Sequence, residues 1–463
     1  MSKNRILITL SLVLFAAAAG TYFVSTSVGT RAKEAAGASA PKDDDVYRQL
    51  ELFGRALEVT KSEYVDEVSN RQLIEAAIQG MVSKLDPHSD FLNAEDSSAL
   101  DEQTTGEFGG LGIEVTMDRG VVKVISPMDD TPADKAGILP GDLITHIDGV
   151  QIQGLTLSEA IKKMKGKPGT SVALKVFREG KEPFDLSIVR DVIRTNPVKF
   201  RMKDGNVGYI RLSTFNRHSY EELESAIKNL GRQNPEIIGY ILDLRNNTGG
   251  LLHQAYQIAD AFIGQGEIVS VIGRHEKSNK VYFATEGDLI KDKPMVVIIN
   301  GASASASEIV AGALKDHRRA VVVGTKSYGK GSVQTVIQLG SDSALKITTA
   351  RYYTPSGRSI QAEGIEPDIV VNRAKVEEIK EERMFAEDTL AGALKNDTKP
   401  TDKKGAREKR DAEIEERDKD DYQLGRAIDI VKGLAIYEKK NSSVPKVKKD
   451  EPKGAKGVKK PAK

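Results

Sequence analysis

The spacing of apolar residues divides the chain into helical and extended segments. Between residues 47 and 85 the apolar positions recur at helical spacing, and Pro87 ends this region because proline cannot continue a helix. From 194 to about 375, short apolar runs alternate with helical patterns, which predicts an α/β core. The runs 237–244 and 295–299 are almost continuously apolar, as is typical of strands buried on both faces.

Residues 109–193 form a second predicted unit, about as long as a small domain. Its pattern is strand, short helix, strand, helix, strand. After an opening strand near residue 113, these elements are expected at 120–125, 132–137, 140–149, 157–163 and 171–177. The last of them alternates apolar and polar residues with a period of two, so we expect a strand with one buried face.

The N-terminus has a basic segment followed by an apolar one. Lys3 and Arg5 precede the apolar residues 6–24, with small residues at 16–20, which is typical of a secretory signal. A run of ~17–20 residues is also long enough to span a bilayer if it is retained. We therefore expect export, to the periplasm or the extracytoplasmic face of the inner membrane. Whether the segment is cleaved or kept as an anchor stays open.

Composition excludes several classes of function. A length of 463 residues exceeds what one core usually supports, so two or more domains are expected. The net charge of +1 does not suggest a nucleic-acid partner. The absence of cysteine excludes a thiol nucleophile and a cysteine-ligated metal, and no pair of histidines has the spacing of a metal-binding motif. No metal and no cofactor are expected.

The candidate chemistry lies between residues 300 and 335. Ser303, Ser305 and Ser307 stand between the apolar run 295–299 and a helical pattern. A serine on such a turn has an exposed Oγ beside the unpaired N–H groups of a helix start, as an acyl-transfer nucleophile requires. Local physics does not choose between Ser303 and Ser305.

A lysine flanked by glycines follows the next predicted strand. Lys330 stands between Gly329 and Gly331, and Gln334 comes four residues later. A lysine can accept the serine proton only if its pKa is lowered by burial. The two motifs together predict a serine–lysine hydrolase.

The segment 109–193 resembles a PDZ domain in the order of its elements and in the sequence of residues 136–149. The resemblance implies that Gly110, Leu111, Gly112 and Ile113 form a loop that binds a terminal carboxylate. Converging backbone N–H groups would hold the carboxylate, and the following strand edge would pair with the peptide.

The chain resembles the carboxy-terminal processing (tail-specific) serine peptidases. Four features carry this resemblance: the serine motif at 303–309, the lysine motif at 329–334, the segment 243–250 and the inserted PDZ unit. The resemblance covers residues 46–372. It implies a crotonase/Clp-protease-like α/β catalytic core with an inserted PDZ domain and flanking N- and C-terminal helices. The predicted parts are a signal peptide or anchor (1–25), a linker (26–45), an N-terminal helical region (46–105), the PDZ domain (106–190), the catalytic domain (194–375), charged C-terminal helices (376–440) and a lysine-rich disordered tail (441–463).

The same resemblance assigns roles within the site. It makes Ser305 the nucleophile and Lys330 the general base, with Gln334 holding the lysine amine. The oxyanion donors would be the N–H groups of Ala306 and Gly250, with Gly249 not excluded. Thr248 stands where many relatives have Pro or Gly, which puts the second donor in doubt. Asp243 and Arg245 are expected to be structural.

The predicted function is an exported endopeptidase that processes or degrades proteins from near their C-terminus. Its substrates would be proteins or peptides with free, apolar C-termini, and the PDZ domain would gate access to the site. An adaptor protein, a homo-oligomer and membrane contact through the N-terminal segment stay open. Two alternatives remain: a non-catalytic PDZ scaffold, and a Ser-His hydrolase that uses His317 or His253.

Overall fold

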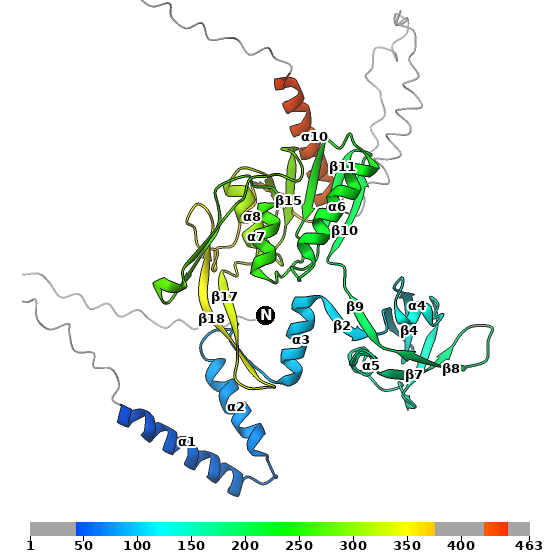
Figure 1. Ribbon diagram of the computed structural model, residues 1–463, viewed down its shortest axis with the longest axis vertical. Coiled ribbons are helices and arrows are strands. Elements are labelled where there is room, and N and C mark those ends of the chain that lie inside the picture. Colours follow the sequence, from blue (N-terminus) through cyan, green and yellow to red (C-terminus); the bar gives the residue numbers. More distant parts are fainter. Residues whose placement is uncertain (1–42, 376–420, 443–463) are drawn as a thin grey trace, which may run out of the picture. The chain divides into compact units, whose positions relative to one another are not determined.

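The computed structural model describes residues 43–375 and 421–442 (Figure 1). The predicted signal or anchor, most of the charged C-terminal region and the lysine-rich tail lie outside these ranges. Within the described ranges, no helix has the length and apolar composition needed to cross a membrane. The chain divides into two compact units, residues 1–76 and 77–463, which we describe separately.

The helical region expected at 47–85 consists of two helices rather than one. Helix α1 (Asp43–Glu63) and helix α2 (Asn70–Val82) are separated by residues 64–69. Ser69 starts the second helix because its backbone N–H and its hydroxyl both donate to Gln72 Oε1, at 3.0 and 2.8 Å. Gln72 N returns a bond of 3.2 Å to Ser69 Oγ, which completes a reciprocal cap. The unit boundary falls within α2.

The predicted α/β core is confirmed in the larger unit. Its central sheet has six strands in the order β10-β11-β12-β15-β16-β19. Their bounds are Val198–Lys203, Val207–Leu212, Gly239–Asp243, Met295–Ile299, Val321–Gly324 and Ile369–Val370. All neighbouring pairs are parallel except β10 with β11. Parallel strands end at the same edge, so the loops after β12, β15 and β16 are brought together there.

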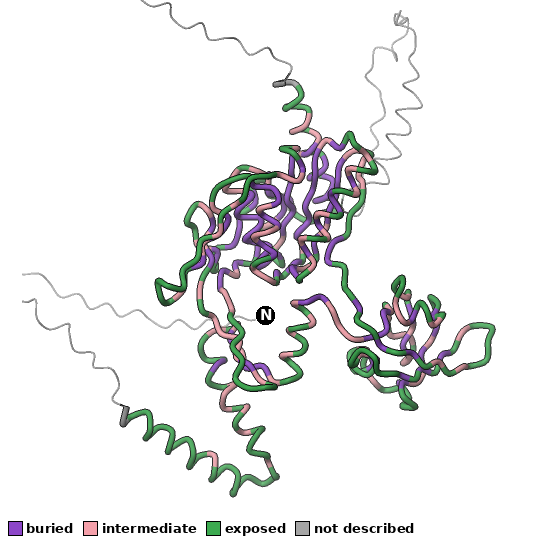
Figure 2. The backbone as a smooth tube through the Cα atoms, in the orientation of Figure 1, coloured by how far each residue is buried: buried purple, intermediate pink, exposed green. Residues whose placement is uncertain are grey.

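Helices cover both faces of this sheet, as its apolar strands require. Helices α6 (Ser219–Gln233), α7 (Leu252–Asp260) and α8 (Ala306–Asp316) share a core with alternate strand residues such as Val297. Helix α10 (Tyr422–Ser442) packs on the other face, against residues such as Val296. The sheet is therefore buried on both sides (Figure 2).

A second sheet carries the segment that follows the lysine. Its strands are β1 (Asp90–Leu92), β18 (Ala344–Tyr353), β13 (Glu267–Gly273) and β14 (Lys280–Phe283), with β17 (Ser332–Gln338) also paired to β18. A 3-10 turn, η1 (Glu276–Ser278), joins β13 and β14. Strand β1 brings the residues just after α2 onto β18, and helix α3 (Ala94–Thr105) follows it.

The inserted unit has its own core and its own sheet. The chain enters through β2 (Glu107–Gly110) and leaves through β9 (Asp191–Arg194), which pair with each other. Between them the sheet order is β3-β4-β5-β7-β8, with β6 paired to β5. The elements are β3 (Ile113–Asp118), β4 (Val121–Pro127), α4 (Pro132–Lys135), β5 (Leu143–Ile147), β6 (Val150–Gln151), α5 (Leu157–Met164), β7 (Ser171–Phe177) and β8 (Phe184–Val189). The six elements expected from the sequence are all present.

Candidate active site

Ser305 lies at the turn between β15 and α8. Its backbone has φ 56° and ψ −111°, a conformation that non-glycine residues seldom adopt. It is the N-cap of α8, and its side chain is only slightly exposed. Such strain on a strand-to-helix turn is typical of a nucleophile elbow.

The three candidate serines have different environments. Ser303 Oγ donates to Leu244 O at 2.8 Å, and Ser307 Oγ donates to Asn247 O at 2.9 Å. Both of these residues are fully buried. The Ser305 hydroxyl donates to no group of the described residues. Of the three hydroxyls, it is therefore the one whose hydrogen is not donated within the described residues.

Glu308, in the first turn of α8, connects this elbow to the lysine loop. Its carboxylate is fully buried. Oε2 accepts from Ser305 N at 2.7 Å and from Lys330 N at 2.9 Å. Oε1 accepts from Ser327 Oγ and Gly329 N, both at 2.6 Å. One carboxylate therefore fixes the backbone on either side of the site.

Lys330 lies in the loop between β16 and β17 and is half-buried. Burial lowers the pKa of its ammonium, the charge of Lys346 lowers it further, and Asp86 and Glu308 act against this. Among the described residues, its Nζ donates no hydrogen bond. The flanking glycines serve the loop itself: Gly329 has φ 90°, and a Cβ on Gly331 would lie 2.3 Å from Gln361 N.

Gln334 lies on β17, next to a bulge in its pairing with β18. Its Nε2 donates to Ser332 Oγ at 2.9 Å and to Thr348 Oγ1 at 3.2 Å. The structure does not join it to Lys330, the partner implied by the family resemblance, so that role stays a prediction.

The two glycines of the candidate oxyanion turn differ in their hydrogen bonds. Gly249 N donates to Asn247 Oδ1 at 2.9 Å. Neither Gly250 N nor Ala306 N donates to any group of the described residues. Gly249 still contributes by its small size, since a Cβ there would lie 2.9 Å from the Ser305 Cβ and 3.0 Å from Ala306 N.

Asp243 and Arg245 hold the start of the same turn, as the sequence suggested. Arg245 Nη2 bonds Asp243 Oδ2 at 2.6 Å and Asp421 Oδ2 at 2.7 Å. The fully buried Asp243 also accepts from the Tyr209 hydroxyl at 2.8 Å. Burial, followed by the charge of Asp243, raises the pKa of Tyr209 to about 12. Arg245 thus ties α10 to the catalytic domain.

Among the described residues, neither histidine considered for a Ser-His mechanism is hydrogen-bonded to Ser305. His317 caps the far end of α8, roughly 18 Å along the helix from Ser305 at 1.5 Å per residue. Its ring lies 2.6 Å from Glu267 O. Burial, and then the charge of Arg217, lower the pKa of His253.

The glycine loop of the inserted unit precedes an edge strand. Gly112 has φ 75°, and its carbonyl accepts from Met128 N at 2.8 Å. Leu111 is buried in the core of this unit. Among the strands of the described residues, β3, which begins at Ile113, pairs only with β4, so its other edge is available to a peptide strand.

Comparisons with known proteins agree with this architecture. Models of peptidase family S41, of the PDZ domain and of the activating protease CtpB N-terminal domain match residues 206–371, 109–184 and 14–96. A carboxy-terminal-processing protease of Bartonella bacilliformis is 48% identical over 396 residues, which cover 84% of this chain and 90% of the relative. The chain belongs to the carboxy-terminal processing peptidases.

Other members of this family are also similar to the chain. The carboxy-terminal processing protease CtpA of Bacillus subtilis is 35% identical over 322 residues, covering 69% of this chain and 68% of the relative. The solved structure of a photosystem II D1 C-terminal processing protease is 31% identical, with 68% and 86% coverage and a TM-score of 0.41. The chain is a serine peptidase of this family with an inserted PDZ domain.

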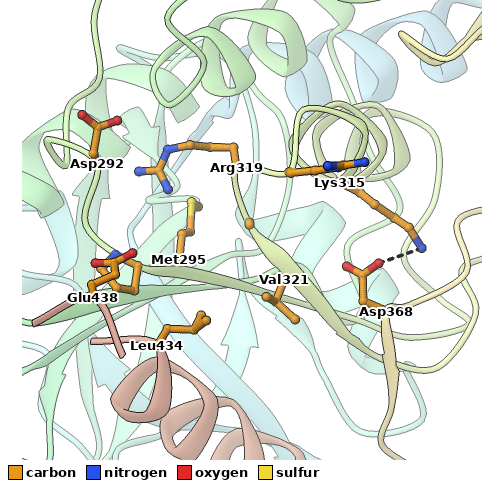
Figure 3. A pocket seen from close by; sticks show the side chains of 11 residues that line it. Asp292, Met295, Lys315, Arg319, Val321, Asp368, Leu434 and Glu438 are labelled. Atoms are coloured by element: carbon orange, nitrogen blue, oxygen red, sulfur yellow. Dashed lines mark ion pairs between the residues drawn. The ribbon is translucent and has the colours of Figure 1, made fainter. Parts of the chain in front are cut away.

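Two pockets lie at different places in this carboxy-terminal processing peptidase. One, of about 410 Å³, is at the amino ends of β15 and β16 and is also lined by Leu434 of α10; Figure 3 shows its Lys315–Asp368 ion pair of 3.2 Å. Ser305 and Lys330 follow the opposite ends of these strands, so this pocket is not part of the site. The other pocket, of about 630 Å³, includes Leu252 and Val333.

Two contributors to the site were not found from the sequence. Glu308 was seen only as part of the serine motif, although an acidic residue three positions after a helix N-cap serine is a capping signal. The segment 86–89 was treated as a helix end, yet both Asp86 and His88 lie near enough to Lys330 to interact with its charge. No local pattern marks that long-range contact.

Proposed function

We propose that this peptidase is an exported endopeptidase that cleaves proteins near their C-terminus, with Ser305 as nucleophile and Lys330 as general base. The observation that carries the proposal is the Glu308 carboxylate, which binds the backbone of both residues. The strained backbone of Ser305 and the lowered pKa of Lys330 support the same assignment.

The reaction would follow acyl-enzyme chemistry. The neutral Lys330 amine takes the Ser305 hydroxyl proton as Oγ attacks the peptide carbonyl. The N–H groups of Ala306 and Gly250 hold the oxyanion, and we favour Gly250 because the Gly249 N–H is bonded to Asn247. The lysine ammonium then protonates the leaving amine. A water, deprotonated by the lysine, then attacks the acyl carbonyl. The acyl–Oγ bond breaks, Oγ takes the proton back from the lysine ammonium, and the second product leaves.

Gln334 would steady the lysine during these proton transfers. Its Nε2 is occupied by Ser332 and Thr348, which leaves its amide oxygen to accept from the lysine ammonium.

The substrate would reach this site through two binding surfaces. Its terminal carboxylate would bind the loop Gly110-Leu111-Gly112-Ile113, and its last residues would pair with the free edge of β3. The 630 Å³ pocket would take a substrate side chain near the cleaved bond. In support, Leu252 follows the oxyanion turn and Val333 precedes Gln334.

Export rests on the basic and apolar pattern of residues 1–25. It places the peptidase in the periplasm or on the extracytoplasmic face of the inner membrane. Fractionation of cells that express the full chain tests it, and recovery of the protein in the cytoplasmic fraction would rule it out.

A peptide with an apolar free C-terminus tests the activity. Cleavage should vanish in Ser305→Ala and Lys330→Ala. Lys326→Ala is the matched control, because this lysine of the same loop is half exposed and pairs with Glu366. An amidated peptide should be cut more slowly, since it lacks the carboxylate. Normal turnover in Lys330→Ala would refute the assignment of the base.

A further inference from the structure

The turn at residues 86–89 is built around one carboxylate. Asp86 Oδ1 accepts from His88 N at 2.8 Å and from Ser89 N at 3.0 Å, and Oδ2 accepts from Ser89 Oγ at 2.7 Å. Burial acts to raise the pKa of Asp86, but these bonds outweigh it and the pKa lies below its usual value. The turn is therefore held by its own carboxylate, which is negatively charged at neutral pH.

The turn is attached to the strand that supports Gln334. Ser89 is buried, and its Oγ accepts from Thr348 N of β18 at 3.1 Å. Thr348 Oγ1 in turn accepts from Gln334 Nε2 at 3.2 Å. Hydrogen bonds thus link Asp86 to Gln334 through Ser89 and the backbone and side chain of Thr348. They join residues almost 250 positions apart. The turn lies in the segment that matches the CtpB N-terminal domain model (14–96), outside the segment that matches the peptidase model (206–371).

The turn also belongs to the electrostatic surroundings of Lys330. Four other charged or titratable groups lie near enough to interact with its charge. Asp86 and Glu308 favour the protonated lysine, Lys346 disfavours it, and His88 is itself affected by the lysine charge. Burial and the Lys330 charge lower the pKa of His88, so it is neutral at neutral pH and Asp86 is the charge that the turn contributes.

We propose that the Asp86–Ser89 turn is a working part of the peptidase site, in which Ser89 positions Gln334 through Thr348 and Asp86 holds the turn and adds one negative charge near Lys330. Both are positioning residues, because neither is placed at the reacting atoms. The inference rests on the proposed role of Lys330 as the base. It assigns two separable effects to the turn: one on the position of Gln334 and one on the proton affinity of Lys330.

Two variants of the full chain separate these effects. Asp86→Asn keeps the shape of the side chain and removes its charge, so the lysine should lose its proton more easily. Ser89→Ala removes the acceptor of Thr348 N and leaves the charge in place. Asp101→Asn, an exposed carboxylate of α3, is the matched control. The readout is the rate at which a serine-directed phosphonate labels Ser305 across a pH series, with thermal unfolding followed in parallel.

The expected results differ between the variants. The acidic limb of the labelling profile should move to lower pH in Asp86→Asn and stay in place in Asp101→Asn. In Ser89→Ala the labelling rate at the high-pH plateau should fall roughly 10-fold or more, because a small displacement of Gln334 misplaces the lysine. The pH at which labelling is lost on the acidic side should not change. A purely structural turn would lower the unfolding temperature without moving the limb, and that outcome in Asp86→Asn overturns the proposal.

The wild type and Lys330→Ala separate this proposal from the one on which it rests. If the wild type is not labelled, or if Lys330→Ala is labelled equally fast, the proposed function fails. If both controls behave as expected and the Asp86→Asn and Ser89→Ala profiles coincide with that of the wild type, only the role of the turn fails.

Discussion

Glu308 Oε2 accepts a hydrogen bond from Ser305 N at 2.7 Å, and this contact orients the N-terminal turn of α8. The same oxygen accepts from Lys330 N at 2.9 Å. A buried carboxylate is stable only when its lone pairs are bonded, and four donors satisfy this one. The Ser305 turn and the Lys330 loop are therefore held by one side chain, and displacing either segment strains the other.

Glu308→Gln should separate this bracing role from simple packing. The amide keeps the volume but replaces one acceptor oxygen with a donor, so at least one backbone N–H loses its partner. We expect the unfolding free energy to fall by about 1–3 kcal/mol and kcat to fall roughly 100-fold through misplacement of the two loops. Denaturant titration and steady-state kinetics measure the two effects. A variant with lower stability and unchanged kcat would contradict the bracing role.

Gly249→Ala tests the crowding between the oxyanion turn and the elbow. The added Cβ would lie 2.9 Å from the Ser305 Cβ, at a backbone with φ 102°. We expect a large loss of kcat as the elbow is displaced. Gly205→Ala is the control: it has φ 74° with no atom within 4 Å of the added Cβ, so it should cost about 1 kcal/mol of stability and leave kcat unchanged. Equal kcat values for Gly249→Ala and Gly205→Ala would contradict the crowding between this turn and Ser305.

Lys346→Gln should shift the pH profile opposite to Asp86→Asn. The charge of Lys346 helps to lower the pKa of Lys330, so its removal raises that pKa. The base is active only when neutral, and activity is lost as the pH falls through the lysine pKa. The acidic limb of kcat/KM should therefore move to higher pH. A limb that stays in place would mean that Lys330 is not the titrating base.

Asp421→Asn tests the attachment of α10. Burial acts to raise the pKa of Asp421, but the hydrogen bonds and charge of Arg245 outweigh it and lower that pKa. The Arg245–Asp421 pair therefore stabilises the fold at pH values above the ordinary aspartate pKa. This contribution is lost as the pH falls through the lowered pKa of Asp421. We expect the variant to lose about 1–2 kcal/mol at neutral pH, allowing for the partly exposed aspartate, and to unfold like the wild type at low pH. Urea titrations at both pH values provide the measurement.

Local patterns in the sequence predicted most of the architecture. The apolar run 295–299 became a central strand, and the period-two run 171–177 became a half-buried strand of the PDZ domain. These two predictions are correct because the apolar spacing of a strand's own residues indicates which of its faces are buried. The break between α1 and α2 was missed, since the cap at Ser69 is a short polar signal within an otherwise helical pattern.

The sequence by itself determined the family, the α/β core, the inserted PDZ domain and the short list of serine and lysine candidates. Motif spacing and apolar periodicity are local properties of a chain. Only the tertiary structure decided which serine hydroxyl has no acceptor among the described residues, and that the N–H of Gly249 is occupied. It also decided that Glu308 binds the backbone of Lys330 and that Asp86 lies near enough to influence its charge. Those facts depend on contacts between segments far apart in the sequence. The order of the parallel strands brings the serine, glycine and lysine loops to one edge, and the antiparallel pairing of β1 with β18 brings the turn at Asp86, so no local pattern encodes them.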